Sequence, residues 1–272
     1  MLEVISYIYL IMLKKKKTAI ITGGCGLLGW QHALALGEIN YNVIILDNDK
    51  NKIKLKKKAI EFKLYNFEIF SVNITSEIKV NNVVNKILKK YHKIDILINN
   101  AAIDYVPKNK NQVKNQFENF DLSRWNRELN IGINAAFICS KIIGCEMLKK
   151  KSGIILNIAS DLSIIAPNQN LYKHLKTVKP VTYSVIKHGI HGLTKYLASL
   201  WAEKNIRVNT LSPGGIENNQ DKKFIQKVKK IIPMGRMARI TEYKETIKFL
   251  CSKESSYITG QNFVVDGGRT IF

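Results

Sequence analysis

Residues 18–29, Thr-Ala-Ile-Ile-Thr-Gly-Gly-Cys-Gly-Leu-Leu-Gly, decide the fold of this 272-residue chain. The apolar and β-branched residues 18–22 predict a buried strand, the glycines predict a tight turn, and 27–38 predict a helix directly after it. Such a turn lets the backbone approach a pyrophosphate, whose charge meets the N–H groups at the positive end of the helix. A plain strand-to-helix connection can also carry these glycines, so the turn needs support from its surroundings.

Asp47 supplies that support, because it ends the next predicted strand, 42–46, about 20 residues after the turn. A carboxylate at this place accepts hydrogen bonds from both ribose hydroxyls of NAD and repels the 2′-phosphate of NADP. Lys50 and Lys52 follow closely and would weaken that repulsion. The first 50 residues therefore predict a nucleotide site that prefers NAD.

Apolar strands and amphipathic helices alternate along the rest of the chain. Further strands are predicted at 68–72, 94–98, 153–158, 207–211 and 262–265, and further helices at 76–92, 124–150 and 183–204. This βαβ repetition predicts an α/β protein with a single-domain Rossmann fold over 12–272, whose doubly wound parallel sheet has seven strands. Two longer interruptions, 103–121 and 161–181, are expected to be functional loops at strand ends.

Composition limits the class of protein. The chain has 43 basic and 21 acidic residues, but all except six of the basic residues are lysine, and no aromatic residues alternate with the lysine runs. Proteins that bind nucleic acids favour arginine side chains and aromatic rings that stack on the bases, so we expect no nucleic-acid partner. The four cysteines form no CxxC pair and no zinc-spaced set, so we expect no metal, no disulfide and a reducing cytoplasm. No apolar run reaches membrane-spanning length, and no membrane association is expected.

Residues 1–11 are apolar and precede the lysines 14–17. A secretory signal carries its positive charge before the apolar stretch, so this order does not predict one. We expect a dispensable N-terminal extension, either disordered or an artefact of a start site that really lies at Met12. The alternative is a short hydrophobic appendage that packs on a partner or a membrane surface.

Several ordered motifs lie along the chain after the glycine loop. They are Asn99-Asn100-Ala101-Ala102, Ser160, Tyr183-Ser184-Val185-Ile186-Lys187, Ser212-Pro213-Gly214-Gly215, and residues 257–261 leading to 264–268. Together they resemble the short-chain dehydrogenase/reductase family from about Met12 to the C-terminus. Residues 212–216, with Asn168, 179–181 and 201–204, are similar to the dehydrogenases of flagellin-modification and nonulosonic-acid sugar pathways.

The resemblance implies NAD as cofactor, a small-molecule substrate, and a homo-oligomer, tetramer or dimer, in which helices 124–150 and 183–204 pair across a two-fold axis. It assigns the catalytic roles to Ser160, Tyr183 and Lys187. It assigns cofactor contacts to these positions: Gly23, Cys25, Gly26, Leu27, Leu28, Asp47, Asn73, Ile74, Asn100, Ala101, Ala102, Tyr183, Lys187, Pro213, Gly214 and Ile216.

The chemistry also follows from the residues themselves. Tyr183 and Lys187 are four apart, one turn along the same face of the predicted helix. Lowering the pKa of a tyrosine from about 10 to near neutrality needs about 4 kcal/mol. One ammonium about 4 Å away supplies roughly that amount at an effective dielectric constant of about 20. Tyr183 can therefore act as general acid or base at a carbonyl or alcohol, while Ser160 holds the substrate oxygen.

Some positions depart from the family pattern. The middle glycine of the loop is shifted by one, Ala102 replaces a glycine, and Asn73 replaces an aspartate. The largest departure is Gly132, which stands where the family has an asparagine that anchors a proton-relay water. Asn130 and Asn134 lie about 200° around the helix from it and cannot substitute.

These observations predict an NAD(P)-dependent oxidoreductase that interconverts a secondary alcohol and a ketone on a small polar, sugar-like substrate. The alternatives are a 3-oxoacyl-type reductase and a nucleotide-binding scaffold without turnover, the latter suggested by Gly132. A further hypothesis makes the substrate anionic, a phosphorylated or nucleotide-linked sugar, because basic residues gather near the expected pocket, although lysine-rich composition alone would place some there. These residues are Lys173, His174, Lys176, Lys179, Arg236 and Arg239.

Overall fold

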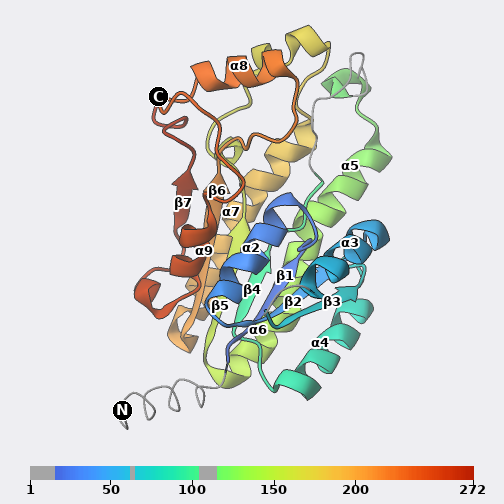
Figure 1. Cartoon of the computed structure of the whole chain (residues 1–272), viewed down its shortest axis with the longest axis vertical. Coiled ribbons are helices and arrows are strands. Elements are labelled where there is room, and N and C mark those ends of the chain that lie inside the picture. Colours follow the sequence, from blue (N-terminus) through green and yellow to red (C-terminus); the bar gives the residue numbers. More distant parts are fainter. Residues whose placement is uncertain (1–15, 62–64, 104–114) are drawn as a thin grey trace.

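The computed structural model describes residues 16–61, 65–103 and 115–272. Its sheet has seven parallel strands in the order β3-β2-β1-β4-β5-β6-β7 (Figure 1). The strands are β1 (Thr18–Thr22), β2 (Asn42–Asp47), β3 (Phe67–Ser71), β4 (Ile96–Asn99), β5 (Gly153–Ile158), β6 (Ile206–Pro213) and β7 (Asn262–Val265). The predicted fold class is confirmed. Strand order reverses between β1 and β4, the place where doubly wound sheets bind ligands.

Helices cover both faces of the sheet. They are α2 (Leu27–Glu38), α3 (Lys50–Glu61), α4 (Glu77–Tyr91), α5 (Leu122–Leu129), α6 (Ala135–Lys150), α7 (Val181–Trp201), α8 (Lys222–Lys230) and α9 (Lys244–Leu250). Side chains of α2, α3 and α9 share one hydrophobic core, and those of α4, α6 and α7 share the other. β1 separates the two, since Ile20 packs in one core and Ile21 in the other. A strand buried on both faces needs apolar residues in succession, which is why 18–22 carries no polar alternation.

The predicted helix 124–150 differs from the observed structure in one respect. The observed helix begins at Leu122, where the Asp121 side chain accepts from the Arg124 N–H. A π-helical turn at Asn130–Asn134 then divides the stretch into α5 and α6. The whole stretch 122–150 is long and apolar enough to cross a membrane, but α6 packs Cys139, Ile143 and Met147 into the core beneath the sheet. Burial in the protein accounts for its apolar composition.

Some elements were not predicted from the sequence. α3, α8 and α9 are short or lysine-rich. α3 and α9 pack on the sheet, whereas α8 packs Phe224 and Val228 against Leu171 and Tyr172 in a separate cluster. The predicted loop 161–181 is present and carries short 3₁₀ turns at Asp161–Ser163, Gln169–Leu171 and Lys173–Leu175. The N-terminal extension and most of the loop 103–121 lie outside the described residues.

Candidate active site

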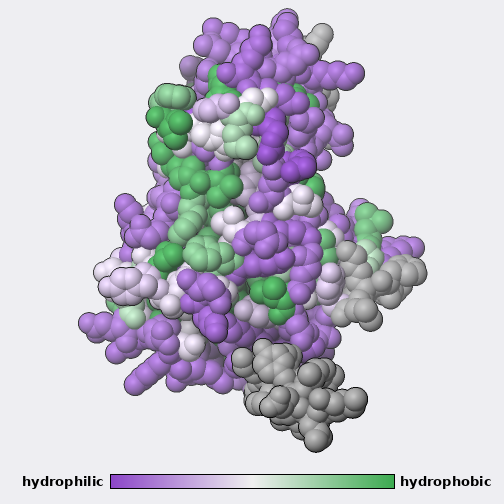
Figure 2. All heavy atoms as spheres, turned by 60° about the vertical axis from the view of Figure 1, so that its left-hand side comes forward, coloured by the Kyte–Doolittle hydropathy of each residue, from purple (hydrophilic) through white to green (hydrophobic). Residues whose placement is uncertain are grey.

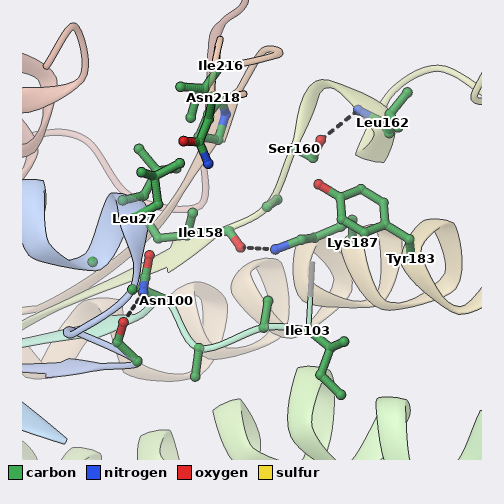
Figure 3. A pocket seen from close by; sticks show the side chains of 18 of the residues that line it. Leu27, Asn100, Ile103, Ile158, Ser160, Leu162, Tyr183, Lys187, Ile216 and Asn218 are labelled. Carbon is green, nitrogen blue, oxygen red and sulfur yellow. Dashed lines mark hydrogen bonds between the residues drawn. The ribbon is translucent and has the colours of Figure 1, made fainter. Parts of the chain in front are cut away.

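A pocket of about 450 Å³ opens at the carboxyl ends of the strands, at the reversal of strand order (Figure 3). Its volume is in the range of small-molecule and cofactor sites. The glycine loop, Asp47 and Asn100 line one part of the wall, and Ser160, Tyr183 and Lys187 line another. One cavity therefore contains both groups of residues singled out in the sequence.

The glycine loop is held close to the end of β4. Gly23 has φ +62°, and a Cβ atom there would come within 2.8 Å of the Ala101 Cα atom. The Asn100 side-chain amide donates to the carbonyl oxygens of Thr22 (3.0 Å) and Gly23 (3.1 Å). Gly26 precedes α2 without offering a side-chain cap, so N–H groups at the start of α2 have no side-chain acceptor there. A pyrophosphate is the kind of anion that such a helix start accepts.

The carboxylate of Asp47 is buried at the end of β2. Its Oδ2 accepts from the Cys25 N–H (2.9 Å), and its Oδ1 accepts from the Asp49 N–H (3.0 Å). These two bonds fix the orientation of the carboxylate at the pocket wall. Lys52 also lines the wall and pairs with Asp49 at 3.3 Å, whereas Lys50 does not line it.

All predicted cofactor residues except Cys25 line this pocket. Cys25 is buried, and burial raises the pKa of its thiol to about 12, so the side chain stays a neutral thiol. Its backbone N–H, which binds Asp47, is the group that serves the site. Asn73 lines the pocket, but its Oδ1 already accepts from the N–H and hydroxyl of Thr75 (3.0 and 2.8 Å).

Tyr183 and Lys187 lie on the first turns of α7 and point into the pocket together with Ser160 (Figure 3). The tyrosine hydroxyl points toward Ser160. The Lys187 ammonium donates to the carbonyl oxygen of Ile158 at 2.8 Å, which fixes this buried side chain beside the end of β5. The three predicted catalytic side chains are thus brought together from the turn after β5 and from α7.

A buried ion pair holds the start of α7. The Glu128 carboxylate of α5 accepts from Arg124 Nε at 2.6 Å and from the Thr182 hydroxyl. Thr182 directly precedes Tyr183, so this contact sets where α7 begins relative to the pocket. α7 has no side-chain cap of its own at Pro180, and Glu128 provides an anchor from a neighbouring helix.

Gly132 lies in the π-helical turn, against α7. A Cβ atom there would meet the Ile186 Cγ2 atom at 2.6 Å, so Ile186 occupies the space that an asparagine side chain would need. Next to it is a cavity of about 10 Å³ that Lys187 and Asn99 also line, the size of about one water molecule. Asn130 and Asn134 bond to each other at 3.3 Å on the exposed side of the helix, as their spacing from Gly132 suggests.

Only one of the six basic residues predicted to face the substrate lines the pocket. Lys179 is buried, with its ammonium 3.7 Å from the centre of the Tyr183 ring. Lys173 and Lys176 are exposed, and His174 pairs with Asp221 at 2.8 Å. Arg236 and Arg239 are exposed and pair with Glu242 at 2.6 and 3.4 Å.

Besides Asp49 at the β2 end, two charged residues that were not predicted line the pocket near Ser160, namely Asp161 and Arg269. Asp161 follows Ser160, and Arg269 follows the motif 264–268, so sequence position gave a weak signal for each. Their pairing over 108 residues was not visible in the sequence.

Residues 26–270 match the model of a family described as enoyl-(acyl carrier protein) reductase. A 3-oxoacyl-[acyl-carrier-protein] reductase from Thermotoga maritima is 30% identical over 260 residues, covering 94% of this chain and 98% of the relative. An NAD-dependent glycerol dehydrogenase from Listeria innocua is 33% identical over 260 residues, covering 94% of each chain. Flagellin modification protein A from Campylobacter coli is 29% identical over 256 residues, covering 93% and 98%.

Solved structures agree with these relatives. A short-chain dehydrogenase from Leptospira borgpetersenii with bound NAD⁺ superimposes with a TM-score of 0.82 at 31% identity, covering 94% of this chain and 93% of that one. The chain is a member of the short-chain dehydrogenase/reductase family, an oxidoreductase that acts on CH–OH groups with a nicotinamide cofactor.

Proposed function

We propose that this protein uses NAD to interconvert a secondary alcohol and a ketone on a small, polar, sugar-like substrate. The observation that carries the proposal is the single pocket in which the Tyr183 hydroxyl points toward Ser160, while Asp47 and the start of α2 line the remainder. The wall with Asp47 and the start of α2 suits a dinucleotide, and the wall with Tyr183 and Ser160 suits the alcohol or carbonyl group of a substrate. A bound nicotinamide supplies the hydride acceptor or donor for that carbon.

Tyr183 handles the proton of the reaction. In the oxidation direction its phenolate removes the hydroxyl proton of the substrate, and in the reduction direction its phenol returns a proton to the carbonyl oxygen. The fixed ammonium of Lys187 lies on the same turns of α7 and favours the phenolate electrostatically. Ser160 donates to Asp161 Oδ1 at 2.8 Å and accepts from the Leu162 N–H at 3.2 Å. Its second lone pair can accept from a substrate hydroxyl, or its proton can rotate toward a substrate carbonyl.

Asp47 supports the preference for NAD. Its carboxylate is oriented by two backbone N–H groups, and a 2′-phosphate beside it would bring two negative charges together. The relatives include an NAD-dependent glycerol dehydrogenase and a structure with bound NAD⁺. Lys52 is the described pocket residue that opposes this preference, and its pairing with Asp49 weakens the opposition.

A 3-oxoacyl reductase is the second candidate, favoured by the 30% identity to the Thermotoga maritima enzyme. The test is the change in absorbance at 340 nm with NAD and a panel of polyols and sugar acids, set against NADH or NADPH with an acetoacetyl thioester. Turnover of a polyol or sugar acid with NAD supports the proposal. Turnover confined to the thioester with NADPH supports the second candidate, and no turnover with either set contradicts both.

A cytoplasmic homo-oligomer is part of the proposal. α6 exposes Phe137, and α7 exposes Val185, Tyr196 and Leu200, which supports the pairing of these helices across a two-fold axis. Other apolar residues of α7 are not available for this pairing, because Ile186, Ile190 and Leu197 are buried in the core. The four cysteines are unpaired thiols, as in reducing compartments.

A second apolar surface lies at the β7 edge of the sheet. Figure 2, which brings the β7 side forward, shows a band of apolar side chains within a largely polar surface. Exposed apolar residues of this region are Phe249, Val264, Ile271 and Phe272. Two separate apolar surfaces are what a tetramer built as a dimer of dimers requires. Light scattering should give a mass of two or four times 31.0 kDa, and a stable particle of 31.0 kDa would contradict the assembly.

A further inference from the structure

The C-terminal turn after β7 is built to place Arg269 in the pocket. Gly267 and Gly268 have φ of +69° and +88°, a region that side chains disfavour. The Asp266 carboxylate accepts from the Gly268 N–H at 2.9 Å and from the Thr270 N–H at 2.8 Å. These bonds close a tight turn around Arg269, which lines the pocket although only Thr270, Ile271 and Phe272 follow it in the sequence.

Arg269 is joined to the catalytic serine through one carboxylate. Its Nη1 atom donates to Asp161 Oδ2 at 2.6 Å, while Asp161 Oδ1 accepts from the Ser160 hydroxyl at 2.8 Å. The side chains of Arg269 and Asp161 are only 8% and 4% exposed. The guanidinium is therefore held on the pocket wall, and only the Asp161 carboxylate stands between it and the Ser160 hydroxyl.

The pair with Asp161 leaves the Nε donor of Arg269 unused. The Nε atom of Arg269 is buried and has no hydrogen-bond partner among the described residues. A guanidinium carries five N–H donors in a planar fork, and a buried donor without an acceptor is costly. A ligand oxyanion is the group that satisfies several of these donors at once.

The charges around the pocket are unevenly distributed. Asp47 and Asp49 lie at the β2 end, with Lys52. Around Ser160 and Tyr183, the charged residues in the described part of the wall are Lys179, Lys187, Arg269 and Asp161. Three positive charges and one negative charge surround the place where the substrate reacts.

We propose that Arg269 binds an oxyanion of the substrate, a carboxylate or a phosphate, so that the substrate is an acidic polyol. This inference rests on the proposed function, because it assigns the substrate class of the same site. Asp161 acts as a positioning residue that holds both Arg269 and Ser160. The exposed lysines and arginines suggested by composition, Lys173 and Arg239 among them, take no part.

The anion must lie close to the reacting carbon. Asp161 bridges Ser160 and Arg269 with two hydrogen bonds from one carboxylate, so the two donors are separated by a single side chain. A short sugar acid or a small sugar phosphate fits this spacing, and a long acyl chain has no oxyanion at such a distance.

The test is a fluorescence titration of the enzyme–NADH complex with D-gluconate, D-glucitol 6-phosphate and neutral D-glucitol. The wild type should bind one of the acids at least about 10-fold more tightly than glucitol, and the tighter acid identifies carboxylate or phosphate. Replacing both partners, in Asp161→Asn/Arg269→Leu, avoids leaving a buried unpaired charge and should weaken that acid by roughly 10- to 150-fold. Binding of glucitol should change much less.

The single variant Asp161→Asn should change acid affinity in the opposite direction. It keeps Arg269 and removes the competing negative charge, so the acid should bind more tightly than to the wild type. Arg239→Leu is the matched control, because it removes an exposed arginine and should leave all three affinities unchanged.

Equal binding of glucitol and both acids by the wild type would overturn the proposal, as would unchanged acid affinity in the double variant. The proposed function fails separately. If the wild type binds an acid through Arg269 but never reduces NAD with it or with any polyol, the anion site stands and the oxidoreductase assignment of the pocket does not.

Discussion

The two halves of the pocket are built in different ways. The half proposed for the cofactor joins three short segments, the glycine loop, the end of β2 and the end of β4, and backbone groups take part in the hydrogen bonds that hold them together. The substrate half joins the turn after β5, the start of α7 and the C-terminal turn through buried charged side chains. Backbone contacts need glycine and a strand–turn–helix order, while side-chain contacts need specific partners far along the chain.

This difference teaches where change is tolerated. A backbone cradle binds any dinucleotide whose phosphates reach the helix start, so the cofactor half can stay constant among relatives. The substrate half can change its specificity through a few residues on loops, provided that every buried charge keeps a partner. The predictions below separate the two halves, beginning with the largest expected effect.

Replacing Tyr183 with phenylalanine should separate chemistry from cofactor binding. The change removes the group that transfers the proton, so turnover should fall by about 10²- to 10⁴-fold. Affinity for NAD, measured by fluorescence titration, should stay within a factor of about 3 because the cofactor half is untouched. An unchanged kcat would show that Tyr183 is not the acid–base group.

Breaking the ion pair of the substrate half should destabilise the protein. Arg269→Leu leaves Asp161 buried without its cation, which typically costs about 3–5 kcal/mol of unfolding free energy. The double variant Asp161→Asn/Arg269→Leu should recover most of that loss. Urea denaturation of both variants measures this, and equal losses in the two would mean that the charges are not coupled.

Replacing Asp47 with alanine tests the cofactor half. The carboxylate should disfavour a 2′-phosphate by about 2–4 kcal/mol, equivalent to about 30- to 1000-fold in affinity. Asp47→Ala should therefore bind NADP much more tightly relative to NAD, with Lys52 now assisting. Lys50→Ala is the matched control, since Lys50 does not line the pocket. Equal affinities of the wild type for the two cofactors would contradict the role of Asp47.

Replacing Gly132 tests the packing next to Lys187, where the two halves of the pocket meet. Restoring the family residue with Gly132→Asn should lower stability by about 1–3 kcal/mol, because the new side chain collides with Ile186. Adding Ile186→Ala should make room and recover part of the thermal stability. If Gly132→Asn alone raised both melting temperature and turnover, the space around Lys187 would be larger than the packing indicates.

His32 lies on α2 beneath the cofactor half, and its expected effect is negligible at neutral pH and grows as the pH falls. It is fully buried, and burial lowers its pKa to about 3, from an ordinary value near 6.5. The unfolded chain binds a proton below pH 6.5 that the folded protein does not. Stability is therefore complete above pH 6.5 and is lost as pH falls toward 3, at about 1.4 kcal/mol per pH unit.

Urea denaturation between pH 6.5 and 4.5 should show this slope in the wild type and a much smaller one in His32→Leu. The exposed His188 provides the control, because His188→Leu should keep the slope. Identical pH dependence in the wild type and His32→Leu would mean that another group titrates in this range.

The sequence by itself determined the sheet, its parallel order and the cofactor half. Consecutive apolar residues such as Ile20 and Ile21 are both buried only if their strand is covered on both faces of the sheet. The glycine turn, Asp47 and Asn100 are local signals, because each is interpreted from the residues next to it in the sequence. Tyr183 and Lys187 were equally predictable, because a four-residue spacing on a helix places two side chains on one face.

The tertiary structure alone decided the substrate half. Sequence position suggested six basic residues near the substrate, but only the folded structure showed that Lys179 lines the pocket while Arg236 and Arg239 bind Glu242. The pairing of Asp161 with Arg269 joins residues 108 apart, and no local pattern encodes a partner at that distance. Whether a charge faces solvent or a ligand depends on which distant segment packs over it, and that is settled only when the chain is folded.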